Sequence, residues 1–205
     1  MALSLPSSLS LWKNLLVGSI PYELGVIGAH FKTLKLNNNQ LSALLLSNNQ
    51  MRGSFPPSFG ALTPNLQHID LSSNNLNGAL PTDLQLPAFL NVNKSSQILS
   101  NLDRLEEEVN IVVKGMSTTY DYELVVLTSL DVSNNLINGT IPSKLGELVG
   151  LHFLNLSRNM LSKSIPAAYS KLHVLESLDL SYNELQGQIP PMFVELTSLE
   201  VFDVS

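Results

Sequence analysis

The chain has 205 residues, of which 44% are hydrophobic and 14% are charged. This composition excludes a disordered chain and leaves room for one extended domain or two small ones. The formal net charge of −6, with only 11 Lys and Arg and no basic run, excludes nucleic acid as the partner. Cysteine is absent, which excludes a disulfide framework, a thiolate metal site and a cysteine nucleophile.

The first residues do not have the pattern of a targeting segment. They carry no positively charged side chain, and Pro6, Ser7, Ser8 and Ser10 interrupt the apolar residues, so no signal peptide is predicted. Nowhere do roughly 18 apolar residues follow one another, the length that crosses a bilayer. No membrane span is therefore expected in this chain.

A repeat of 24 residues organises most of the sequence, which contains 41 leucines and 20 asparagines. Apolar residues recur at offsets 0, 3, 5, 10 and 14 of each copy, with Asn at offset 8, Gly at 12 and Pro at 15. The period-2 apolar pair at offsets 3 and 5 predicts a short strand with its leucines turned inward, and stacked copies predict a parallel sheet. Copies begin at Pro6, Phe31, Leu41, Leu66, Leu127, Leu151, Leu175 and Leu199.

The connections and the stability of each copy follow from the same template. Gly at offset 12 permits backbone conformations denied to other residues, and Pro at offset 15 needs no ladder donor. The return arcs are therefore expected to be extended or to contain short helical turns. One copy buries too few apolar side chains to fold alone, so neighbouring copies must share a continuous core.

The Asn at offset 8 is expected to form a structural ladder. It lies where the chain turns into the core, and its amide can satisfy backbone groups of adjacent turns. Replacing one such Asn by Ala is expected to cost about 1 to 3 kcal/mol. The ladder residues are Asn14, Asn39, Asn49, Asn74, Asn135, Asn159 and Asn183.

The first irregularity in chain order is a contraction at residues 31–40. The copies at Phe31 and Leu41 begin only ten residues apart. Parallel neighbours require a crossover of about a dozen residues or more. The sheet is therefore predicted to be broken, hairpinned or disordered between Phe31 and Leu46.

The second irregularity is an insertion at residues 86–126, where the template is absent. Ile98, Leu99, Leu102, Leu105 and Val109 have helical spacing, whereas residues 109–114 (VNIVVK) alternate as a strand. An insertion in a solenoid forms a loop or small subdomain on one face. The predicted organisation is thus repeats over residues 1–85, an insertion over 86–126, and repeats over 127–205 with the last copy truncated.

The series LxxLxLSxNxLxGxIP resembles the plant-specific leucine-rich repeat of receptor-like proteins, receptor kinases and polygalacturonase inhibitors. The resemblance implies an α/β fold, a right-handed leucine-rich-repeat solenoid with short parallel strands on its concave face. The insertion, with Tyr120 to Leu124 leading into LTSLDVSNN, looks like the island that precedes the last repeats of plant receptor-like proteins. Single copies depart from the template at Trp12, Phe55, Leu80 and Lys163.

No catalytic or cofactor site is predicted. The four histidines are isolated in sequence, and no motif of a metalloprotease, serine hydrolase, P-loop or kinase occurs. We therefore expect a chain that binds without catalysing, with no metal and no cofactor.

The outward side chains of the strands are the candidate contacts for a peptide or protein. Asp at offset 4 forms a column that could attract a basic partner, although Asp is simply common at this template position. A solvated sheet surface is the alternative for every one of these positions. The candidates are His68, Asp70, Asp131, His152, Phe153, Arg158, Asp179, Tyr182 and Asp203.

Three sequons, at Asn93, Asn138 and Asn155, fit a secreted glycoprotein, although a repeat rich in Asn and Ser produces sequons by chance. A glycan on Asn155 would block part of the concave sheet.

The resemblance implies part of the ectodomain of a plant receptor-like protein in defence or developmental signalling. The intact homologue would lie at the extracellular face of the plasma membrane, bind a peptide, protein or glycan, and act through a co-receptor or partner kinase. The open alternatives are a receptor-kinase ectodomain, a polygalacturonase inhibitor and a nonfunctional truncated remnant.

Overall fold

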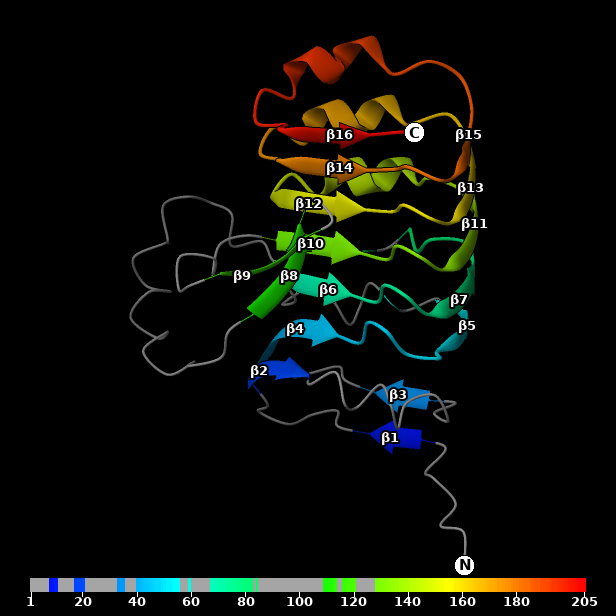
Figure 1. Cartoon of the computed structure of the whole chain (residues 1–205), viewed down its shortest axis with the longest axis vertical. Helices are drawn as coiled ribbons and strands as arrows, with labels where there is room; N and C mark the ends of the chain where they lie inside the picture. Colours follow the sequence, from blue (N-terminus) through cyan, green and yellow to red (C-terminus); the bar gives the residue numbers. More distant parts are fainter. Residues whose placement is uncertain are drawn as a thin grey trace, which may run out of the picture.

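The computed structural model describes residues 8–10, 17–20, 33–35, 40–55, 59, 67–82, 84, 109–113, 116–120 and 128–205. Side chains are described for 43–55, 59, 67–82, 84 and 128–205. Within these residues the chain forms a solenoid of parallel strands, and successive turns lie on top of one another (Figure 1).

A parallel seven-stranded sheet forms one side of the stack (Figure 1). Equal offsets of neighbouring copies are paired, because Ile69, Leu130, Leu154, Leu178 and Phe202 share one register. This confirms the predicted stacking, and it shows that the insertion does not disturb the register between β6 and β10. The strands are β2 (Val17–Ile20), β4 (Gln40–Leu45), β6 (His68–Asp70), β10 (Thr128–Asp131), β12 (Leu151–Asn155), β14 (Ser177–Asp179) and β16 (Val201–Asp203).

A second, five-stranded parallel sheet forms from the return arcs, which the sequence predicted to be extended or in short helical turns without indicating a sheet. It follows the offset-8 Asn of each turn and ends near offset 12, where Gly78, Gly139 and Gly187 have φ of 74°, 84° and 93°. Lys163 occupies the same position in its copy and adopts φ of 67°. The strands are β5 (Arg52–Ser54), β7 (Asn75–Gly78), β11 (Leu136–Thr140), β13 (Met160–Lys163) and β15 (Glu184–Leu185).

Short 3-10 helices complete three of the turns. They are η5 (Ser143–Glu147), η6 (Ala167–Lys171) and η7 (Pro191–Glu195), and each starts directly after the proline at offset 15. Neighbouring helices pack closely: a Cβ added to Gly146 would lie 2.4 Å from the carbonyl oxygen of Ala168. The short helical arcs expected from the sequence are therefore present.

The core runs through the middle of the stack. Inward residues of both sheets and of the helical turns contribute to it, as expected from the template offsets. Leu151, Leu161, Leu172 and Leu175 have no exposed surface. Burial of each leucine contributes about 1.5–3 kcal/mol, and each side chain touches residues of adjacent turns, so the turns stabilise one another.

The pairing near the N-terminal end agrees with the predicted contraction. β3 (Thr33–Lys35) pairs with β1 (Ser8–Ser10) in a separate two-stranded parallel sheet. β4 pairs instead with β2 and β6. The sheet is thus broken between the copies that begin at Phe31 and Leu41.

Part of the insertion is described as an antiparallel pair, β8 (Val109–Val113) and β9 (Met116–Tyr120). The strand predicted over residues 109–114 is confirmed. The helical spacing at residues 98–109 lies almost wholly outside the described residues.

Candidate recognition surface

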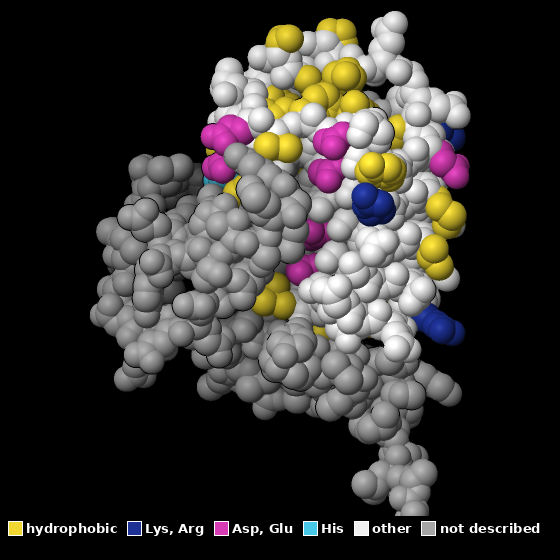
Figure 2. Space-filling view, in the orientation of Figure 1, with side chains coloured by type: hydrophobic (Ala, Val, Ile, Leu, Met, Phe, Trp, Pro, Cys, Tyr) yellow, Lys and Arg dark blue, Asp and Glu magenta, His cyan; other side chains and the backbone are white. Residues whose placement is uncertain are grey.

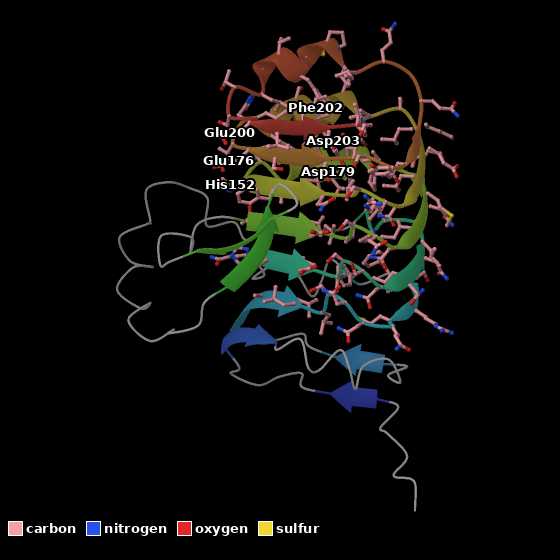
Figure 3. All side chains as sticks on the ribbon, in the orientation of Figure 1. His152, Glu176, Asp179, Glu200, Phe202 and Asp203 are labelled. Atoms are coloured by element: carbon pink, nitrogen blue, oxygen red, sulfur yellow. The ribbon has the colours of Figure 1, made fainter. Side chains whose placement is uncertain are left out.

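The outward side of the seven-stranded sheet is the candidate site. We call it the strand face and define it by offsets 1, 2, 4, 6 and 7 of the copies that form β6, β10, β12, β14 and β16. In the copies of β6, β10, β12 and β14, offsets 3 and 5 are turned into the core. The alternation of the strand therefore places offsets 2, 4 and 6 on the opposite side, and offsets 1 and 7 flank them along the chain. Figure 3 shows His152, Glu176 and Glu200 at one end of the strands and Asp179 and Asp203 toward the other.

The offset-4 acids are tied to the serine two residues later. Asp179 accepts hydrogen bonds from the Ser181 backbone N–H at 3.0 Å and from its hydroxyl at 2.7 Å. Asp70 with Ser72, and Asp203 with Ser205, form the same pair of bonds. This is an Asx turn that ends the strand. The aspartate column therefore has a structural role that the sequence analysis missed, although the recurring Asp/Asn-x-Ser pattern signals it.

Asp131 lies in the middle of this column, and its carboxyl group has the most strongly shifted pKa among the carboxyl groups of the described residues. Burial raises its pKa to about 6, the charge of Asp70 adds to that rise, and the hydrogen bond from the Ser133 N–H opposes it. Asn155 replaces Asp in the next turn, and its Nδ2 donates to Asp131 Oδ2 at 3.1 Å. The amide thus separates the charges of Asp131 and Asp179.

The two histidines of the face are held in the neutral form. His68 is only 6% exposed, its Nδ1 lies 3.1 Å from the Ser129 hydroxyl, and burial lowers its pKa to about 4. Burial also lowers the pKa of His152, while the nearby Glu176 raises it. Phe153, another predicted contact residue, is 7% exposed. His68 and Phe153 therefore offer little surface to a ligand.

The offset-7 residues form an exposed row at the end of the strands. Five of them have left-handed backbone with φ between 53° and 56°. In two adjacent turns they are Arg158 and Tyr182, whose guanidinium carbon lies 4.2 Å from the ring centroid. This cation–π pair, with Tyr182 61% exposed, is the most prominent predicted contact pair. The row's residues are Asn48, Ser73, Asn134, Arg158 and Tyr182.

The offset-8 Asn residues join adjacent turns beneath this face. Asn159 Nδ2 donates to the carbonyls of Val132, Leu156 and Ser157, and its Oδ1 accepts from the Ile137 N–H at 3.0 Å. Asn74, Asn135 and Asn183 make the equivalent four bonds. Asn49 bonds two carbonyls of its own turn. Asn14 and Asn39 lie outside the described residues.

The charge on the strand face is strongly negative, and Asp and Glu side chains gather on the side that carries the strands (Figure 2). Arg158 is its one arginine, and the face as defined has no lysine. The carboxylates belong to Asp70, Asp131, Glu176, Asp179, Glu200 and Asp203.

The described part of the chain forms neither a metal-binding cluster nor a membrane-spanning helix. No three His, Asp or Glu side chains come together there as a metal would need. Nor does any helix in that part have the length and apolar character required to cross a membrane.

The stacked turns and their outward face define a parallel-strand solenoid built from a sequence repeat. A family model described as Leucine Rich Repeat matches residues 40–62, 65–86, 126–148, 150–172 and 174–196. These matches cover more than half of the chain, which therefore belongs to the leucine-rich repeat family. None of the curated proteins matches the chain.

Solved structures of plant receptors are similar to this chain. The ectodomain of the Arabidopsis receptor kinase HAESA, in complex with the peptide hormone IDA and the co-receptor SERK1, is 30% identical, with a TM-score of 0.56. The ectodomain of GASSHO1/SCHENGEN3 from Arabidopsis thaliana, in complex with CASPARIAN STRIP INTEGRITY FACTOR 2, is 26% identical, with a TM-score of 0.55. The matches cover 100% and 95% of this chain, which spans only 27% and 20% of those chains.

A shorter solved chain gives a similar result. A chain in the Arabidopsis thaliana BIR3–SERK2 complex is 30% identical with a TM-score of 0.50, and the match covers 77% of this chain and 65% of that one. The similarity therefore extends to plant leucine-rich-repeat receptor ectodomains of different length.

Proposed function

We propose that this chain is a non-catalytic recognition module from the extracellular ectodomain of a plant receptor-like protein. The observation that carries the proposal is the strand face, a regular outward surface on a sheet whose turns are fixed by the Asn ladder and a shared core. Rigid elements of this kind hold contact residues in place at little entropic cost. The peptide-bound receptor ectodomains that resemble the chain support a peptide or protein ligand.

The charge of the face favours a ligand with basic side chains. Glu176 and Glu200 lie at offset 1 and Asp179 and Asp203 at offset 4, so the two acidic rows are about 10 Å apart. Adjacent turns repeat each row at about 4.8 Å. An extended basic peptide lying across the strands would place Lys or Arg above both rows. Asp179 and Asp203 are the contacts we assign to it, with Arg158 and Tyr182 at the border of the site.

Labelled synthetic peptides of defined charge test this proposal. Two 12-residue peptides share every apolar residue, and four Lys in one are four Glu in the other. Fluorescence anisotropy is expected to show binding of the Lys peptide alone. Equal or tighter binding of the Glu peptide, or no binding of either, would overturn it.

A double variant, Asp179→Asn with Asp203→Asn, locates the contact. Asn keeps the Asx turn, as Asn155 already does in the turn that precedes Asp179. Removing two partly exposed charge contacts is expected to weaken binding of the Lys peptide about 2- to 30-fold. Glu184→Gln on β15 is the matched control, because it removes a charge from the other sheet and is expected to leave binding unchanged.

A receptor-kinase ectodomain is the second candidate, favoured by the similar structures from receptor kinases. Sequencing the transcript beyond Ser205 distinguishes the two, because kinase motifs after a membrane helix identify the kinase and a short tail identifies the receptor-like protein. The insertion at 86–126 is the feature that favours the receptor-like protein, and we assign it to a wall of the ligand or co-receptor site. Inhibition of polygalacturonase would instead support an inhibitor, and a protease-labile, aggregated product would support a remnant.

The proposed location is the extracellular face of the plasma membrane. Protease treatment of intact plant cells that express the full transcript tests it. Loss of the repeat epitope without lysis is expected, and an epitope that is cleaved only after lysis would contradict the location.

A further inference from the structure

The sequon at Asn138 lies on the outer side of the second sheet, away from the strand face. Asn138 and Thr140, its acceptor and hydroxyl residues, are both exposed on β11, and Gly139 between them has φ of 84°. Within the described part of the chain, the Asn138 side chain makes no hydrogen bond. A sugar can therefore be attached to its Nδ2 without breaking a hydrogen bond to the described residues.

Two apolar side chains are exposed beside this asparagine. Leu136 precedes it by two residues on the same side of β11 and is 46% exposed. Met160 is its register partner on β13 and is 40% exposed. Sheet geometry places Asn138 about 7 Å from Leu136 along the strand and about 4.8 Å from Met160 across it. Figure 2 shows hydrophobic side chains along the edge of the molecule that carries these strands in Figure 1.

The sequon at Asn155 has the opposite environment. Asn155 Oδ1 accepts from the Ser157 backbone N–H at 3.1 Å and from its hydroxyl at 2.7 Å. Its Nδ2 donates to Asp131 Oδ2, and Ser157 is only 5% exposed. Asn155 stands between Asp131 and Asp179 in register. A sugar on Nδ2 would crowd these neighbours and disturb the bond to Asp131.

We propose that Asn138 carries an N-linked glycan that covers Leu136 and Met160, and that Asn155 stays unmodified in the folded protein. The inference uses the extracellular location proposed above. The donor is a lipid-diphosphate-linked oligosaccharide. A bond forms between Nδ2 and the sugar C1, the C1–O bond to the diphosphate breaks, the lipid diphosphate leaves with the electron pair, and Nδ2 releases one proton. The glycan leaves the strand face free for a ligand.

The test is secretion of the full chain from a eukaryotic cell behind an added signal sequence. Glycosidase release in ¹⁸O water marks each formerly occupied Asn as labelled Asp for peptide mass mapping. Label is expected at Asn138 and not at Asn155, and Asn93 is scored separately. An unlabelled Asn138 in folded, secreted protein would overturn the site, and label at Asn155 would overturn the selectivity. The host signal sequence drives secretion, so either result is independent of the native location.

Four variants test the covering of the apolar side chains. Thr140→Ala and Asn138→Gln each remove the sequon, and both are expected to lose one glycan and to self-associate more in light scattering than the parent. Asn155→Asp is the matched control, because it removes that sequon and keeps the Asx turn that Asp179 forms in the next turn, and it is expected to keep both the glycan mass and the scattering of the parent. Adding Leu136→Ser and Met160→Ser to Asn138→Gln is expected to restore the monomer. Unchanged scattering of the sequon variants would refute the covering role.

Discussion

Replacing Asn159 by Ala is expected to destabilise the solenoid, because this amide joins its own turn to the preceding one. Asn159 is 8% exposed and makes four hydrogen bonds to backbone groups. Three of them go to carbonyls that keep another partner. Val132 O still accepts from Asn135, Leu156 O from Asn183, and Ser157 O from the Asn134 N–H.

The Ile137 N–H is the group that loses its acceptor, since Ala offers none at this position. An unsatisfied buried donor costs about 1–3 kcal/mol, and losing the three amide bonds adds about 1 kcal/mol because each carbonyl keeps a partner. The free energy of unfolding is therefore expected to fall by about 2–4 kcal/mol.

Urea unfolding followed by circular dichroism measures this change in unglycosylated protein. The midpoint is expected to decrease with an unchanged m-value, and the Ile137 amide is expected to lose its protection from hydrogen exchange. Asn138→Ala is the matched control, because its exposed side chain makes no hydrogen bond in the described part of the chain, and a change within about 0.5 kcal/mol is expected. A loss below 1 kcal/mol for Asn159→Ala, with Ile137 still protected, would refute the role of the ladder.

Four further predictions concern single positions, each measured by urea unfolding. Lys163→Gly is expected to stabilise the chain by about 0.5–1 kcal/mol, because it removes a non-glycine residue at φ of 67°, and an unfolding midpoint below the parent's would contradict it. Tyr169→Phe is expected to be neutral or stabilising by about 1 kcal/mol, because the fully buried hydroxyl has no hydrogen-bond partner among the described residues, and a loss above 1 kcal/mol would show a partner instead. Gly146→Ala is expected to cost about 1–3 kcal/mol, because its Cβ would meet the Ala168 carbonyl, and an unchanged midpoint would mean that the helices separate easily. Asp131→Asn is expected to increase the free energy of unfolding more at pH 7.5 than at pH 4.5. A carboxyl whose pKa is raised to about 6 stabilises the fold only in its protonated form, and that contribution is lost as pH rises through 6. The stabilisation gained at pH 7.5 over that at pH 4.5 is at most about 3 kcal/mol, and the weakened hydrogen bond to Asn155 reduces the net gain. An equal effect of the substitution at both pH values would contradict a raised pKa caused by burial of Asp131.

His68 gives the opposite pH dependence. Its pKa is lowered to about 4 from 6.5, so its neutral form stabilises the fold fully above pH 6.5 and the contribution is lost as pH falls toward 4. The contributions of Asp131 and His68 to the free energy of unfolding therefore change in opposite directions between about pH 4 and pH 6. Each slope becomes visible only when the other group is removed.

The strand positions were predictable because one period governs them. The 24-residue repeat places an inward pair at offsets 3 and 5 in every copy, and Leu154 and Leu156 show the result. The break between the copies at Phe31 and Leu41 was predictable from chain length alone, because ten residues cannot make a parallel crossover. Both inferences use geometry that is local to one or two copies.

The second sheet could not be predicted, because it depends on contacts between copies. The same holds for the hydrogen bonds and the burial of residues on the strand face. β11 and β13 pair through their backbone groups. Their side chains show no alternating apolar pattern long enough to predict a strand. The Asp and Ser of the Asx turns both appear in the template, but their bond shows only when the strand end is built. The burial of His68 against Ser129 joins residues 61 positions apart, so no local pattern indicates it.

Photo-crosslinking of the bound Lys peptide tests most directly whether the strand face is the recognition surface. A photoreactive residue at the centre of the peptide, followed by peptide mass mapping, is expected to label β12, β14 and β16 and the exposed Tyr182. The Asp179→Asn and Asp203→Asn double variant is expected to lose most of this labelling. Labelling concentrated on β11 and β13, and unchanged in the double variant, would contradict recognition by the strand face.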